Sequence, residues 1–108
     1  MDNNEQKPVS VVLCTVPAGS AHAIVRQILD RRLAACVNIT PVRSLYSWEG
    51  SMCDDAEELL VIKTMTGKFR ELSEFIVSIH PYELPEVIAL PVTDGYPPYL
   101  AWVSGEVG

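Results

Sequence analysis

The feature that most constrains the fold is the alternation of strand-like runs with two helical segments of similar length. Residues 21–35 and 66–80 carry apolar side chains three and four positions apart, the spacing that gives a helix one apolar face. Ser20 can cap the first helix. His80 precedes Pro81, and a residue before proline is kept out of the α conformation, so the second helix is predicted to end there.

Strand-like runs of apolar and β-branched residues surround these helices and cover 8–16, 36–48, 57–65 and 86–92. The order strand, helix, strand, strand, helix, strand is typical of a ferredoxin-like βαββαβ sandwich of the α+β class. In that fold both helices cover one face of an antiparallel sheet. A turn at 94–95, followed by prolines and helically spaced apolar residues, predicts a short C-terminal helix.

Length and composition predict one domain. The chain has 108 residues, a common domain length, and 48% of them are hydrophobic, which is enough for a core. We therefore expect a single domain over 9–108. Residues 1–8 are polar and are expected to form a flexible leader.

Charge, hydropathy and cysteine usage limit the class of protein. The net charge is −6 and no basic stripe is present, so nucleic acid is not expected as a partner. The longest apolar runs are strand-sized, far short of the about 20 residues of a membrane helix, so no membrane partner is expected. Cys14, Cys36 and Cys53 form no CxxC pair, which favours a reducing compartment, the cytoplasm, over disulfides or a closed zinc site.

The two strands of the central hairpin are predicted to be longer than the first and last strands of the sheet. Its two strands reach about 12 residues each, because the polar run MCDDA (52–56) is expected to begin the second of them, whereas the first and last strands have only about 8 and 7. Tyr46 and Trp48 then lie on the overhang, where burying each one would contribute roughly 2–3 kcal/mol. A closed ring of subunits would cover the overhang and the sheet face that the helices leave open. The alternative is a monomer in which both aromatics simply flank the turn.

Five runs together resemble the CutA family, which is associated with divalent-cation tolerance. They are VVLCTVP, RRLAACVNI, SLYSWEG, ELLVIKT and HPYELPEVIALPV, and they follow the family's order and spacing over about residues 9–103. The resemblance implies a ferredoxin-like fold and a tight homotrimer whose architecture is similar to that of the PII signalling proteins.

The resemblance also implies divalent metal, copper above all, as the ligand. The family's metal ligands correspond here to Cys14 and His80, while Ile79 stands where bacterial members have a second histidine. Thiolate and imidazole are ligands that copper accepts. The alternatives are that Cys14 is a small buried apolar residue and that His80 faces solvent or bonds a carbonyl. No metal is expected to be required for folding.

Other residues are expected to line or support a cleft beside this pair. Trp48 and Tyr82 are the aromatic candidates. Glu83 and Glu86 could supply oxygen ligands or pair with Lys63, which needs a partner inside an apolar strand.

Two functions remain open at this point. The first is a trimeric CutA-type protein of the response to metal ions, and the alternative is a PII-like sensor or scaffold that binds a small molecule or a protein in clefts between subunits. An enzyme is not expected, because the sequence has no Ser-His-Asp set, phosphate-binding loop or dinucleotide motif. The arginine and glycine-rich cradle of the acylphosphatases, which share this fold, are also missing after the first strand.

Overall fold

Four strands and three α-helices follow one another in the predicted order within residues 8–108, which the computed structural model describes. The elements are β1 (Val9–Pro17), α1 (Ala21–Asp30), β2 (Cys36–Trp48), β3 (Ser51–Met65), a 3₁₀ turn η1 (Thr66–Lys68), α2 (Phe69–Ile79), β4 (Ile88–Pro91) and α3 (Pro97–Glu106). This order confirms the ferredoxin-like α+β fold with its short C-terminal helix. The predicted flexible leader falls almost wholly on residues 1–7, which lie outside the described residues.

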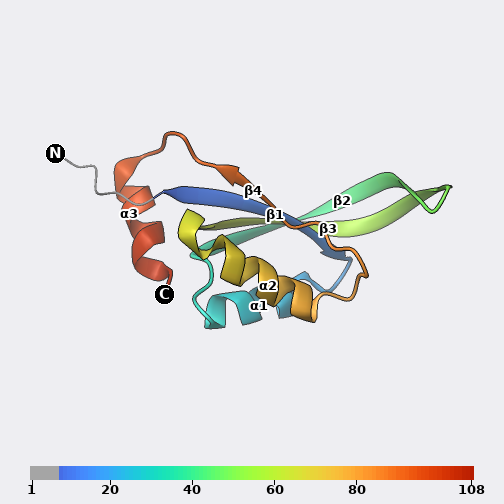
Figure 1. Ribbon diagram of the computed structural model, residues 1–108, viewed down its shortest axis with the longest axis horizontal. Coiled ribbons are helices and arrows are strands. Elements are labelled where there is room, and N and C mark those ends of the chain that lie inside the picture. The colour runs from blue at the N-terminus through green and yellow to red at the C-terminus, as the bar shows by residue number, and fades with distance from the viewer. Residues whose placement is uncertain (1–7) are drawn as a thin grey trace.

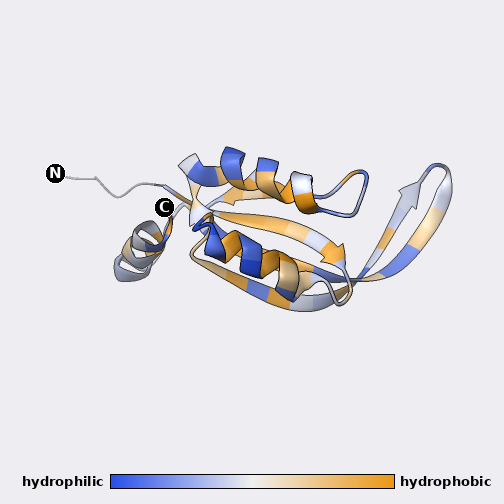
Figure 2. Cartoon of the chain, turned by 90° about the horizontal axis from the view of Figure 1, so that it is seen from below, coloured by the Kyte–Doolittle hydropathy of each residue, from blue (hydrophilic) through white to orange (hydrophobic). Residues whose placement is uncertain are grey.

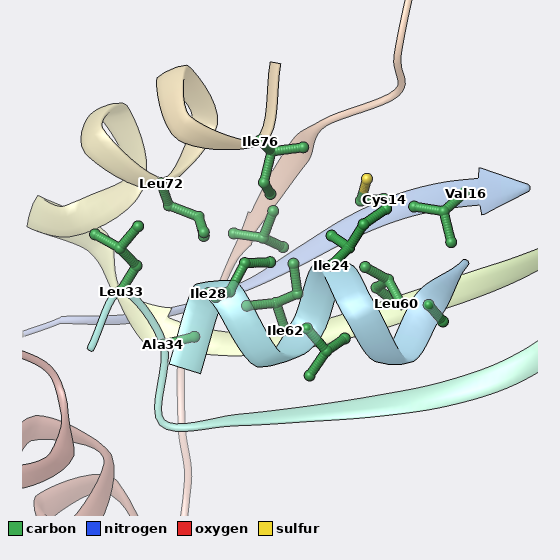
Figure 3. Packing of buried hydrophobic residues seen from close by; sticks show 13 residues of the cluster. Cys14, Val16, Ile24, Ile28, Leu33, Ala34, Leu60, Ile62, Leu72 and Ile76 are labelled. Carbon is green, nitrogen blue, oxygen red and sulfur yellow. The ribbon is translucent and has the colours of Figure 1, made fainter. Parts of the chain in front are cut away.

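The strands form one antiparallel sheet in the order β2-β3-β1-β4. Helices α1 and α2 lie side by side on one face of it, and α3 lies at the end of the sheet near the C-terminus (Figure 1). Alternate residues of β1 point toward the two helices. In the space between sheet and helices they pack with branched side chains of both helices and of β3 (Figure 3). The fully buried members include Val12, Cys14, Val16, Ile28, Leu60, Ile62, Leu72 and Ile76.

Helix α1 is shorter than its periodicity predicts, because the chain turns after Asp30. Arg32 adopts a left-handed conformation with φ 54°, and the Leu33 amide donates to the carbonyl of Ile28 at 3.2 Å. This is the hydrogen-bond pattern of a helix that closes on a left-handed residue. The apolar residues Leu33 and Ala34 remain buried after this turn, which is why the helical pattern extended past the true end.

The cap predicted at Ser20 is wrong. The Ser20 hydroxyl donates to the Pro17 carbonyl at 2.6 Å and makes no capping bond to the helix. Glu58 of β3 takes that role, since its Oε1 accepts from the amides of Gly19 at 3.0 Å and Ala21 at 3.2 Å. A carboxylate suits this position because the first amides of a helix carry partial positive charge.

The prediction that the hairpin strands are longer than the other two strands is confirmed. β2 has 13 residues and β3 has 15, whereas β1 has 9 and β4 only 4. Pairing of β1 with β3 stops at Pro17 and Glu57, so the remainder of the hairpin extends alone beyond the helices (Figures 1 and 2). The described residues extend 54 Å along their longest axis and 26 Å along the next.

Within residues 8–108, helices leave most of the second face of the sheet open, and only its end is covered, where Val103 of α3 packs against Val9 and Met65. Val11 and Leu13 of β1 point to this open face together with their partners in β3, Lys63 and Val61. Ile88 and Leu90, which flank them on β4, are each 49% exposed. An apolar strip therefore faces solvent in the isolated chain. Among the described residues, no helix combines the length and the apolar character needed to cross a membrane.

Candidate functional site

The structure brings the two predicted metal ligands to a single backbone oxygen. Cys14 lies on β1 with its side chain fully buried under the helices, and its Sγ is 3.7 Å from the carbonyl oxygen of Thr15. His80 follows α2, and its Nε2 is 2.8 Å from the same oxygen. Residues 66 positions apart in the chain thus become neighbours, because the segment after α2 lies against the half of β1 that β4 leaves unpaired.

His80 also ends α2, as the sequence predicts. Its backbone is extended, with φ −75° and ψ 137°, and its amide still donates to the Ile76 carbonyl at 2.9 Å. The Thr15 carbonyl can only accept, so Nε2 carries the proton, and Nδ1 accepts from the Tyr82 amide at 3.1 Å. Both ring nitrogens of this neutral histidine are therefore engaged, and a metal would have to displace one hydrogen bond.

The Cys14 thiol is held in its protonated form. Burial is the main cause and the negative charges of Glu86 and Glu57 add to it, and together they raise the pKa of Cys14 to about 12. A metal would therefore have to displace the thiol proton. Residues 8–108 contain no group of three or more His, Cys, Asp or Glu side chains arranged to hold a metal ion, so Cys14 and His80 have no third side-chain ligand of these types.

A cleft of about 820 Å³ lies beside this pair, between the base of the hairpin and the segment that follows His80. Four of the predicted cleft residues line it, namely Trp48, Tyr82, Glu83 and Glu86. The other lining residues are Thr15, Arg43, Ser44, Leu45, Tyr46, Glu57, Pro81 and Leu84. The volume is in the range of small-molecule sites, so the cleft is large enough to hold a ligand of that size.

Lys63 lies away from this cleft, and the expected ion pair with Glu83 or Glu86 is wrong. Its ammonium contacts the Asn38 side-chain oxygen, and it lies 3.8 Å from the Cys36 sulfur. The physical reason is register, because Lys63 lies directly opposite Cys36 near the far end of the sheet from the hairpin overhang. Lysine here finds its partners on the neighbouring strand.

Glu57 is the residue that sequence reasoning missed. It is only 6% exposed, and its Oε2 accepts a 2.6 Å hydrogen bond from the Tyr82 hydroxyl. Burial, followed by this hydrogen bond and the carboxylate charge, raises the pKa of Tyr82. The sequence gives little sign of this contact, since Glu57 stands among acidic residues that are expected to be solvated.

The segment after α2 is held to the sheet at two points, by the bonds of His80 to Thr15 and of Tyr82 to Glu57. Within the segment, the rings of His80 and Tyr82 pack together with centroids 4.7 Å apart. These contacts fix one wall of the cleft against β1 and β3. The arrangement can bind a ligand in a preformed cleft, and it places a thiol and an imidazole behind that wall.

Comparison with known proteins gives a consistent match. The family model described as CutA1 divalent ion tolerance protein matches residues 10–106. Protein CutA of Mus musculus is 48% identical over 97 residues, which cover 88% of this chain and 55% of that protein, so the chain spans about half its length. The divalent-cation tolerance protein CutA of Thermus thermophilus is 44% identical over 100 residues, covering 91% and 97%. A solved structure described as the PII-like protein CutA of Nostoc superposes with a TM-score of 0.88 at 35% identity, covering 92% of this chain and 97% of that one.

Proposed function

The chain belongs to the CutA1 divalent ion tolerance family, and on that premise we propose that it takes part in the response to divalent metal by binding copper at Cys14 and His80. One observation carries the proposal: both side chains reach the carbonyl oxygen of Thr15. Thiolate favours Cu(I) and imidazole accepts copper, so the pair has suitable chemistry once the thiol proton leaves.

The proposal includes a homotrimer in the cytoplasm that acts without catalysing a reaction. The uncovered apolar face and the unpaired end of the hairpin support self-association, since a closed ring would cover both. The three cysteines are free thiols, which suits a reducing compartment. Light scattering at micromolar concentration should return three times the mass of the chain, and a monomer mass would reject the ring.

Copper titration of the reduced protein against a competing chelator tests the site. Cys14→Ser and His80→Ala should each weaken binding, while Cys53→Ser, a control that removes a thiol from the hairpin, should not. Ile79→His restores the histidine pair that the family resemblance implies and should tighten binding. Equal affinity in all of these proteins would reject the site.

The pH dependence provides a second test of the same site. The Cys14 thiol loses one proton on binding, so affinity should rise about tenfold per pH unit. Because the pKa of Cys14 is raised to about 12, this rise should continue well above pH 9. A plateau near pH 8 would show that another group releases the proton.

A second candidate function is a non-enzymatic sensor of the PII-like kind that binds a ligand in the cleft. The cleft volume of about 820 Å³ and the buried carboxylate of Glu57 in its wall favour it. A thermal-shift screen with all metal chelated separates the two functions. A compound that raises the melting temperature under these conditions supports the sensor, and a chain that responds only to metal supports the first proposal.

A further inference from the structure

The loop 92–96 joins β4 to α3 at the end of the molecule opposite the hairpin overhang (Figure 1). None of its residues belongs to a helix or a strand, and Asp94 and Gly95 are both exposed. The sequence predicts a turn at this dipeptide, and neither candidate function uses it. An aspartate followed by glycine has a chemistry of its own, because the amide nitrogen that follows the aspartate can attack the carbon of its side-chain carboxyl group.

The structure places these two groups next to each other. The Gly95 amide donates to Oδ1 of Asp94 at 3.0 Å. In the part of the chain that the structure describes, this amide makes no other hydrogen bond. Neither a strand ladder nor a helix therefore holds the nitrogen away from the carboxyl group. Reacting groups that are kept in contact meet far more often than groups that must diffuse together.

Packing favours glycine at position 95. A Cβ atom added there would lie 3.1 Å from a side-chain carbon of Leu100, which is closer than ordinary van der Waals contact. Glycine also leaves its amide nitrogen unshielded, since no side chain stands beside it. The packing that selects glycine here thus also leaves the nitrogen open to the neighbouring carboxyl group.

The reaction needs no reactant other than water. The Gly95 nitrogen bonds to Cγ of Asp94 and gives up its proton while the carboxyl hydroxyl leaves, so a water molecule is released and a succinimide forms. Water then adds to the ring carbonyl that comes from the Asp94 backbone and breaks its bond to nitrogen. Gly95 stays joined to Cγ, and the former backbone carbonyl becomes a side-group carboxylate. The product is isoaspartate, with the mass and the oxidation state of the starting chain.

We infer that Asp94–Gly95 is a site of spontaneous covalent modification, where aspartate converts to isoaspartate and the attachment of α3 to the sheet is weakened. Isoaspartate adds a carbon to the main chain just before α3. That helix rests on β1 and β3 through the fully buried Val103, and Leu100 packs against the same cluster. Because Leu100 lies against Gly95, a shift at residue 95 is passed on to the cluster. The inference goes beyond both candidate functions and depends on neither.

Incubation of the full chain for several weeks at mildly acidic pH, below its melting temperature, tests the inference. Peptide mapping separates isoaspartate from aspartate at equal mass, and isoaspartate methyltransferase labels only the converted peptide. We expect isoaspartate to accumulate at residue 94 within about tenfold of its rate in a free peptide of residues 90–99. Asp55, which Ala56 follows within β3, is the internal control and should remain aspartate.

Two variants separate this chemistry from general ageing of the chain. Gly95→Ala should slow the conversion about tenfold, because its Cβ crowds the attacking nitrogen. Asp94→Glu keeps the charge and should abolish the conversion, because a larger ring would have to close. The glutamate variant also decides the matter if Gly95→Ala does not fold.

The effect on α3 has its own measurement. Purified isoaspartyl protein should melt about 4 °C or more below fresh protein at the same concentration. If residue 94 stays aspartate while the free peptide converts, the modification site is overturned, as it is by equal conversion at Asp55 or in Asp94→Glu. An unchanged melting temperature of the converted protein would overturn the effect on α3. Copper titration tests the metal proposal separately.

Discussion

Alkaline pH should destabilise the protein through Cys14, by an amount that follows from its burial. In the folded chain its pKa is raised from 9.0 to about 12. The folded state thus holds the thiol proton more tightly than the unfolded state does. This contribution to stability is fully present below pH 9 and is lost as the pH rises through the interval between the two values.

The expected loss is large enough to measure. One pKa unit corresponds to about 1.36 kcal/mol, so the free energy of unfolding should fall by about 2 kcal/mol between about pH 8 and pH 10.5 through this group alone. The full difference, reached only near pH 12, is about 4 kcal/mol.

Urea unfolding of the wild type and of Cys14→Ala across this range, at one fixed protein concentration, isolates the effect. The alanine variant starts less stable because it leaves a cavity in the core, but it should lose about 2 kcal/mol less on the way to pH 10.5. Tyrosines and lysines titrate in both proteins, so their effect cancels in the comparison. Cys53→Ala is the control and should follow the wild type. Parallel pH curves for the wild type and Cys14→Ala would refute the assignment of a buried, protonated thiol.

Three further predictions concern stability, measured as the free energy of urea unfolding at neutral pH. Glu58→Gln should cost about 1 kcal/mol because it weakens the cap of α1. Ser20→Ala should cost less, since the amide of residue 20 still bonds the Pro17 carbonyl that the hydroxyl contacts. A larger loss for Ser20→Ala than for Glu58→Gln would show that the serine is the cap after all. Tyr82→Phe should cost about 1–3 kcal/mol because it leaves the buried Glu57 carboxylate without its hydrogen bond, and an unchanged midpoint would mean that water replaces the hydroxyl. Leu72→Ala, at a fully buried position between the helices and the sheet, should cost about 2–5 kcal/mol, and a loss below 1 kcal/mol would contradict the packing described.

Local patterns in the sequence predicted the elements correctly where the controlling interactions are short in range. The second helix ends at His80 because of the adjacent Pro81, a steric effect between neighbours. The β2 strand was predicted over 36–48 and has these bounds, since alternation defines its two faces residue by residue. The first helix was predicted five residues too long, because buried Leu33 and Ala34 continue the apolar pattern beyond the turn.

The candidate site depends on contacts that no local pattern contains. The resemblance to the family identified Cys14 and His80, but only the folded chain shows that both meet the Thr15 carbonyl, which lies 65 positions from His80. Sequence reasoning assigned Lys63 to the wrong partners and overlooked Glu57, because both assignments depend on strand register. A shift of one residue in that register would move each side chain to the other face of the sheet.

The sequence by itself determined the order of the elements, the length of the hairpin and the position of the helix stop, since periodicity and proline sterics act over a few residues. Tertiary structure alone decided which carboxylates are buried, which one caps α1 from 37 positions away and where the cleft opens. The physical reason is that burial and charge pairing depend on how segments distant in the sequence pack together. That packing exists only in the folded chain, where the helices cover the sheet that contains the long hairpin.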